Sequence, residues 1–301
     1  MFTVNRDEAV RLRETRPKAT RQDLETLAGV DRDRSAPKAR LGEPARSWQH
    51  WVREVALEPE EGIVLPATWL YPVDENRLGD AVLYFDDRGR WTDLRKQGRA
   101  AAWAGFLGAG QERQLLTVDL RGWGDTMPAE LPYDIAGWGG RDRWIAYVSA
   151  ALGDSIMAMR IRDGLAAFRW LKAQHGTERI VVGGHGLGAI VALYVAALAG
   201  DVAGVFCDEM PVSIESLVAG AEVSWPPDVF IPEIVMHFDL PDLVGMVAGP
   251  VLVAAPLDAR RQPLDPESAK KTYENALVNN SQCTLQRVSS PAEFMGHVFG
   301  E

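Results

Sequence analysis

Five residues near the middle of the chain, Gly184-His185-Gly186-Leu187-Gly188, match the motif G-x-S-x-G except at its central serine. In enzymes with this motif, the serine stands on a tight turn between a strand and a helix, and its hydroxyl attacks a carbonyl carbon. Here the central residue is Gly186, which suits an unusual backbone conformation but carries no nucleophile. The sequence therefore predicts the turn without an acyl-enzyme at this position.

The other members of a Ser-His-Asp triad would follow in the order acid, then histidine. Asp258 comes just after an apolar run, and His297 follows the last apolar run. We expect both side chains near the turn, with Asp265 as a substitute acid, although an aspartate can also cap a turn and a terminal histidine can be a surface residue. No metal site or cofactor is expected, because the remaining histidines show no metal-ligand spacing and we interpret them as structural: His50, His175, His185 and His237.

An oxyanion hole usually combines the backbone N–H after the nucleophile with one from the loop after an earlier strand. These donors would be Leu187 and either Asp86 or Asp87. Backbone donors remain when a serine is lost, so the site could still bind a carbonyl or carboxylate oxygen. Two other side chains could attack in place of the serine, Cys207 and Ser213.

The same glycines permit a second interpretation. Gly184, Gly186 and Ala189 fit G-x-G-x-x-G/A, which binds a dinucleotide pyrophosphate when it follows a strand and opens a helix. Asp208 ends the next apolar run, about where a ribose-binding acid would lie. This fingerprint comes after four expected strands instead of opening the sheet, which favours the first interpretation.

Apolar runs alternate with helical stretches along most of the chain, and this pattern predicts an α/β fold with a mostly parallel, doubly wound sheet. Residues 51–73 alternate like a β-hairpin. The expected strands that follow are 80–87, 113–120, 179–184, 202–209, 249–258 and 283–290. The expected helices are 94–107, 155–174, 187–199 and 266–278.

Two long connections, 122–153 and 211–248, leave the carboxyl ends of expected strands. Open α/β sheets bind ligands at that edge, so we expect these connections to form the walls of a pocket. Residues 1–47 are charged, with apolar residues at helical spacing, and we interpret them as a helical extension or linker before a main domain spanning 48–301.

Four segments together resemble the acetyl xylan esterase and dienelactone-hydrolase-like branch of the α/β-hydrolase superfamily: "TVDLRGWGDT", "SIMAMRIRDGLAAFRWL", "GGHGLGAIVALYVAAL" and "FDLPDLVGMVAGPVLVAAPLDA". The resemblance covers roughly Val52 to Val298. It implies an α/β-hydrolase fold and a carboxylic ester hydrolase acting on sugar esters or related small esters. Carried over by position, the acid falls on Asp258, the histidine on His297 and the nucleophile on Gly186.

Because Gly186 replaces the nucleophile, several functions stay open. The chain can be an esterase-like protein that is inactive or weakly active by the standard mechanism, with water or another nucleophile attacking instead. It can be a non-catalytic module that binds a carbohydrate or a protein, or a dinucleotide-binding protein. A serine deliberately replaced by glycine is a further explanation.

The composition narrows the classes of molecule that the chain could bind. Of 301 residues, 47% are hydrophobic and 25% charged, which is typical of a soluble globular protein, and the formal net charge is −10. A negative surface disfavours nucleic acids and anionic membranes. We expect a small ester or carbohydrate ester as ligand, and a cytoplasmic protein unless an upstream export segment is missing. The N-terminal segment is similar to linkers in multidomain esterases, so the chain can be part of a larger protein.

Overall fold

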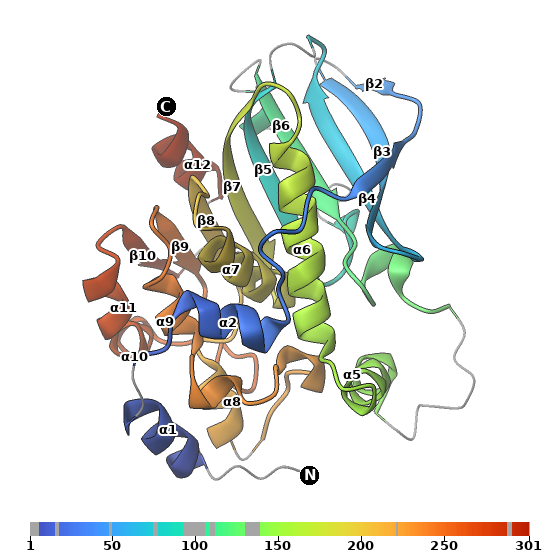
Figure 1. The fold of residues 1–301 in the computed structure, drawn as a ribbon. Coiled ribbons are helices and arrows are strands. Elements are labelled where there is room, and N and C mark those ends of the chain that lie inside the picture. The colour runs from blue at the N-terminus through green and yellow to red at the C-terminus, as the bar shows by residue number, and fades with distance from the viewer. Residues whose placement is uncertain are drawn as a thin grey trace.

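The computed structural model describes residues 6–15, 18–47, 50–74, 78–92, 106–108, 112–129, 139–220, 222–287 and 291–300. Within these residues one ten-stranded sheet is flanked by helices (Figure 1). The helix expected at 94–107 lies almost entirely outside them.

The strands are arranged in the order β1-β3-β4-β6-β5-β7-β8-β9-β10, with β2 paired to β3. The strands are β1 (Lys38–Leu41), β2 (Ala45–Ser47), β3 (His50–Glu60), β4 (Ile63–Pro72), β5 (Gly79–Asp86), β6 (Arg113–Val118), β7 (Thr177–His185), β8 (Gly204–Asp208), β9 (Val251–Ala254) and β10 (Cys283–Gln286). Pairing is antiparallel from β1 to β6 and parallel from β6 to β10. The mostly parallel α/β fold expected from the sequence is confirmed.

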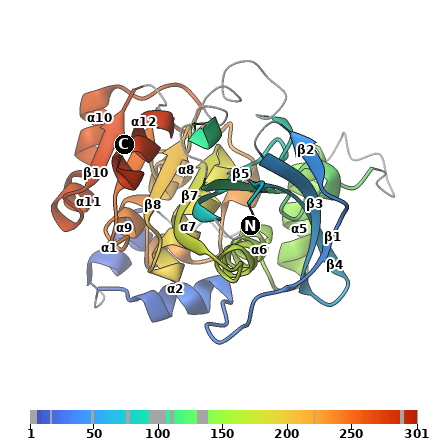
Figure 2. The same cartoon turned by 90° about the horizontal axis from the view of Figure 1, so that it is seen from above.

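Helices cover both faces of the parallel part. The helices of the fold include α1 (Arg6–Thr15), α2 (Arg21–Ala28), α5 (Arg141–Ala151), α6 (Ile156–Lys172), α7 (Leu187–Ala199), α8 (Ile214–Ala219), α9 (Leu240–Val244), α10 (Pro266–Thr272), α11 (Glu274–Asn279) and α12 (Pro291–Phe299), with short 3-10 turns η1 (Gly124–Thr126), η3 (Pro227–Val229) and η4 (Ile234–Met236). Figure 2 shows α6 and α7 together on one face of the sheet. Among the described residues, none of the helices combines the length and apolarity needed to cross a bilayer.

Alternating residues of β5 supply the two cores. Leu83 and Phe85 pack with α6 and α7, whereas Val82 and Tyr84 pack in a second core with residues of α12. Since successive side chains of a strand point to opposite faces, a strand covered on both sides must be apolar throughout. This explains why the central strands read as continuous apolar runs.

Two expectations are corrected. Residues 38–47, expected to belong to a helical extension or linker, form two edge strands, so the sheet begins before the predicted boundary at residue 47. The helix expected at 266–278 is two helices that meet at Tyr273. The extension also contributes to the main core, because Leu24 and Ala28 of α2 are fully buried there.

Candidate functional site

The turn between β7 and α7 adopts a backbone conformation that favours glycine. Gly186 has φ 59° and ψ −125°, a region that residues with a Cβ enter only with strain. A Cβ on Gly184 would collide with the backbone of Gly188, and one on Gly188 would collide with the backbone of Phe85. The glycines of the motif therefore let α7 pack directly over β7 and β5.

The carboxylate of Asp87 fills the space beside Gly186. Oδ2 of Asp87 accepts a hydrogen bond from the backbone N–H of Leu187, with 3.0 Å between the two atoms. A Cβ added to Gly186 would lie 2.5 Å from the same oxygen, which is closer than such atoms approach. The side chain of Asp87 thus lies where a residue larger than glycine would point.

A buried ion-pair network anchors the loop that carries Asp87. The side chain of Arg90 binds Asp119, and its Nη1 donates to Oδ2 of Asp125 at 2.8 Å. The backbone N–H of Arg90 also donates to Oδ1 of Asp119 at 2.6 Å. Arg90 and Asp119 are 7% and 0% exposed, so this anchor is shielded from water. It fixes the loop after β5 to the segment that follows β6.

Three ionisable residues end adjacent parallel strands. In the sheet register, Asp86 of β5 is the partner of His185 of β7, and His185 is the partner of Asp208 of β8. Nε2 of His185 lies 3.0 Å from Oε2 of Glu209, and Nδ1 lies 3.8 Å from Oδ2 of Asp86. With Asp87, these residues form a cluster of four carboxylates and one imidazole directly under the turn.

Burial and charge affect the two neighbouring aspartates in opposite ways. Burial opposes ionisation of Asp86, but hydrogen bonds from Arg88 and the adjacent His185 lower its pKa overall. Burial raises the pKa of Asp87, and the negative charge of Asp86 raises it further. The hydrogen bond from the Leu187 N–H lowers this pKa but does not reverse the rise. Asp86 is therefore held as a carboxylate, whereas ionised Asp87 depends on the N–H of Leu187.

The sequence alone did not predict this cluster, because the end of each expected strand was considered by itself. The runs that become β5, β7 and β8 end in "FDD", "GGH" and "CDE". In a parallel sheet these ends meet at one edge, and that signal was present in the sequence.

The predicted triad is not assembled, and the placement of His297 is corrected. His297 is an exposed residue near the end of α12. Arg179, near the start of β7, donates to the carbonyls of Val298 and Phe299 at 3.3 and 3.2 Å. Gly186 is seven steps along the extended chain from Arg179, a span of about 23 Å. His297 therefore lies at the opposite end of the sheet, where Figure 1 shows α12 and the C-terminus.

The predicted acids stabilise local structure. Asp258 does follow β9, but its Oδ1 accepts the backbone N–H groups of Arg260 and Gln262, both at 2.8 Å. Asp265 caps α10 by accepting the N–H of Ser268 at 3.0 Å. Both carboxylates therefore cap a turn or a helix, which is the simpler of the two interpretations that the sequence allows for them.

The alternative nucleophiles are likewise engaged elsewhere. Cys207 is fully buried in β8, and burial raises the pKa of its thiol, which disfavours the nucleophilic thiolate. Ser213 is 5% exposed and caps α8, with its Oγ accepting the N–H of Ser216 at 2.9 Å.

The dinucleotide interpretation gains no support from the geometry. A pyrophosphate would need the free N–H groups at the start of α7. The N–H of Leu187 binds Asp87, and the N–H of Gly186 donates to the carbonyl of Asp208 at 2.9 Å. The negative charge of Asp87 would also repel a phosphate there.

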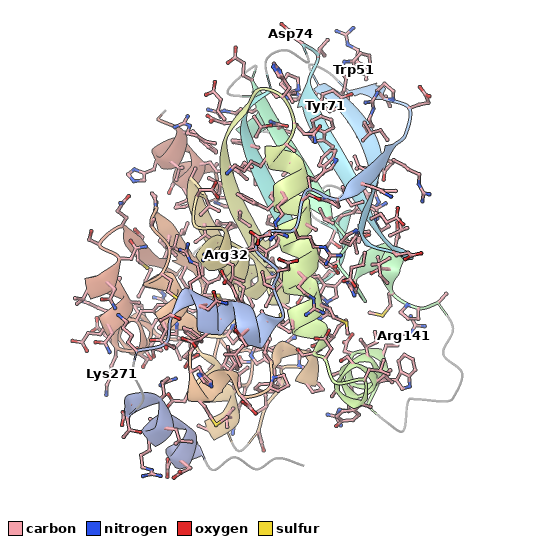
Figure 3. All side chains as sticks on the ribbon, viewed as in Figure 1. Arg32, Trp51, Tyr71, Asp74, Arg141 and Lys271 are labelled. Atoms are coloured by element: carbon pink, nitrogen blue, oxygen red, sulfur yellow. The ribbon has the colours of Figure 1, made fainter. Side chains whose placement is uncertain are left out.

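A separate cavity of about 650 Å³ lies between α5, the start of α6 and the segment around η3 and η4. Its walls come mostly from the two long connections, as expected, and include Tyr147, Val218, Asp228, Phe230, Ile231 and Met236. In Figure 3, Arg141 marks the start of α5 at the lower right, and Trp51 and Tyr71 lie near the top. Nη1 of the fully buried Arg160 lies 2.7 Å from Oδ2 of Asp228.

The fold is similar to that of solved esterases. Acetyl xylan esterase from Paenibacillus sp. R4 superposes with a TM-score of 0.62 at 16% identity, over 96% of this chain and 98% of that one. Acetyl xylan esterase 1 from Thermoanaerobacterium sp. JW/SL YS485 gives 0.58 at 15% identity, over 93% and 91%. Glucuronoyl esterase from Solibacter usitatus gives 0.59 at 12% identity, over 99% and 91%.

No protein-family model matches the chain, and no curated protein matches it in sequence. At such low identities the structural likeness establishes the fold alone. The chain thus has an α/β-hydrolase fold like that of acetyl xylan esterases and related esterases.

Proposed function

We propose that this chain is an esterase-like α/β-hydrolase protein of the carbohydrate-ester class that forms no acyl-enzyme at its β7–α7 turn. The class is supported by the neighbouring structures, which are acetyl xylan and glucuronoyl esterases. The absence of an acyl-enzyme is supported by the turn itself. In this proposal Gly186 takes the position of the serine in the nucleophile elbow, and a glycine offers no side-chain atom for acylation.

One observation carries this proposal, which is the hydrogen bond between Asp87 and Leu187. In an esterase of this fold, the N–H after the nucleophile stabilises the negative oxygen of the tetrahedral intermediate. Here a carboxylate already accepts that N–H. A developing oxyanion would lose this donor, so binding of the transition state is weakened as well as the attack.

The direct test is hydrolysis of 4-nitrophenyl acetate and of acetylated xylan by the full chain, with intact-mass analysis after a fluorophosphonate probe. We expect no saturable turnover and no covalent adduct. Saturable turnover would contradict the proposal, because the Leu187 N–H that would stabilise its transition state is already occupied. The variant Asp87→Ala is assayed beside it, because any turnover that uses Asp87 as a base or nucleophile must disappear in it.

The cavity beside α5 supports a second candidate function, binding of a small ester or carbohydrate ester without turnover. Its wall is mostly apolar, as the walls of small-molecule sites usually are. An acetylated xylo-oligosaccharide would be titrated by calorimetry. We expect the wild-type chain to bind it. Val218→Trp, which places a large side chain in the cavity, should abolish binding. Val278→Trp, at an 80% exposed position on α11, should leave binding unchanged.

The remaining partner assignments rest on charge. The net charge of −10 supports a protein that binds neither nucleic acid nor anionic membrane. A cytoplasmic location and membership of a larger multidomain chain stay predictions.

A further inference from the structure

His185 holds one buried nitrogen beside two carboxylates without a hydrogen bond. The residue is 8% exposed, and its Nδ1 has no hydrogen-bond partner among the described residues. The distance of 3.8 Å from Nδ1 to Oδ2 of Asp86 is beyond hydrogen-bond range. One ligand atom from each of Asp86, Asp87 and His185 lies within 4.8 Å of the other two. Buried polar atoms are normally paired, so this nitrogen needs an explanation.

The contact of the other ring nitrogen indicates which tautomer is present. Nε2 lies 3.0 Å from Oε2 of Glu209, and an ionised carboxylate can only accept a hydrogen bond. Nε2 therefore carries a proton and donates it to Glu209. In the neutral ring, Nδ1 then presents a lone pair toward the carboxylates of Asp86 and Asp87. Three electron-rich atoms that face one another are stabilised by a cation between them.

We propose that Asp86, Asp87 and His185 bind a divalent transition-metal ion of the zinc type through one oxygen of each carboxylate and Nδ1 of the imidazole. Glu209 is the outer partner that orients the ring, in the way that carboxylates commonly orient metal-binding histidines. One nitrogen and two oxygens suit Zn²⁺ or Mn²⁺ better than Mg²⁺, which prefers oxygen ligands alone. Three protein ligands leave a coordination position for water.

This site gives a reason for glycine at position 186. The Oδ2 atom of Asp87 is held by the N–H of Leu187 at 3.0 Å, which leaves Oδ1 for a metal ion. A side chain on Gly186 would displace Asp87 from that place. The glycine at position 186, which the proposed function places where an esterase has serine, and the position of the carboxylate are thus two parts of one arrangement.

Arg88 is the cation that competes for the site. Its Nε donates to Oδ1 of Asp86 at 2.8 Å, and its guanidinium also contacts Oδ2. The Arg88 side chain is 43% exposed, so it can turn toward solvent when a metal ion enters. Replacing Arg88 with alanine should therefore strengthen metal binding, whereas a surface site elsewhere would not respond.

The experiment is calorimetric titration of the full chain, freed of metal with a chelator, with ZnCl₂ and in parallel with MgCl₂. We expect about one equivalent of Zn²⁺ to bind, with affinity at least tenfold weaker in His185→Ala and in Asp87→Asn, and several-fold weaker in Gly186→Ala. The matched control is His175→Ala, which removes an exposed histidine in the loop before β7 and should not change binding.

Absence of Zn²⁺ binding, or binding that His185→Ala leaves unchanged, would overturn the proposal. If the variants fail to fold, X-ray absorption of the Zn²⁺-loaded wild-type chain decides instead. We expect a shell of oxygen ligands with one imidazole nitrogen. A sulfur ligand or two imidazoles would place the ion elsewhere and overturn the assignment. Because these measurements use no ester, they stand apart from the test of hydrolysis.

Discussion

Asp87 and Leu187 are one hundred residues apart in sequence, and a hydrogen bond of 3.0 Å joins the carboxylate of the first to the backbone N–H of the second. The contact ties the loop after β5 to the first turn of α7. That N–H belongs to the group at a helix start that has no partner within the helix. Asp87 therefore stabilises α7 as well as covering its end.

We expect Asp87→Ala to lower the free energy of unfolding by about 1 kcal/mol, because it removes this cap. Asp87→Asn keeps an acceptor oxygen and should lose less. Urea unfolding followed by circular dichroism measures both. Equal losses in the two variants would show that the cap contributes little.

Gly184→Ala should be strongly destabilising, by roughly 3 kcal/mol or more, because its Cβ would meet the backbone of Gly188, which cannot move without shifting α7. The control is Gly108→Ala, where a Cβ has open space. Thermal unfolding of the two variants makes the comparison, and similar melting temperatures would contradict the close packing at the turn.

Breaking the pair Arg160 and Asp228 should cost about 3–5 kcal/mol, because each charge is fully buried and removal of one leaves the other uncompensated. The variants are Arg160→Met and Asp228→Asn. The double variant should recover part of the loss, since it buries no lone charge. Additive losses in the double-mutant cycle would argue against a direct interaction.

The buried carboxylate of Asp239 should make the stability of the fold depend on pH. It caps α9, and burial raises its pKa to about 6 against the hydrogen bonds that it accepts from Leu240 and Ile214. The carboxylate of Asp239 therefore binds a proton more tightly in the folded chain than in the unfolded chain, where aspartates have a pKa of about 3.9. Protonation stabilises the fold, and that contribution is lost as the pH rises from about 4 through the folded pKa of about 6.

Asp239→Asn removes the titration while it keeps an acceptor. Relative to the wild-type chain, the variant should gain stability as the pH rises between these two values, by up to about 1.4 kcal/mol per pH unit. Urea unfolding across this range measures the difference. The control, Asp33→Asn at an exposed position, should give a constant difference.

The sequence was most informative where structure depends on local pattern. The helix expected at 187–199 has the observed bounds of α7, and the hairpin expected at 51–73 is β3 and β4. The glycine turn was predictable for the same reason, since its conformation restricts which residues can occupy it.

The candidate site depends on contacts between distant segments and was less predictable. Chain order placed His297 after the last strand, but α12 runs back along the sheet, and its last turn lies beside Arg179 at the far end of β7. The loop after β5 was expected to offer a backbone N–H, whereas the side chain of Asp87 is what reaches Leu187. The direction of a loop side chain is set by tertiary packing, which no local pattern encodes.

Whether the turn can support an acyl-enzyme is tested most directly by the burst of 4-nitrophenolate from 4-nitrophenyl acetate with the variant Gly186→Ser. We expect no burst above the wild-type trace, because the restored hydroxyl finds no triad histidine at His297 and shares its space with Asp87. A burst stoichiometric with protein, with the acetyl group recovered on the new serine, would contradict the proposed loss of this chemistry.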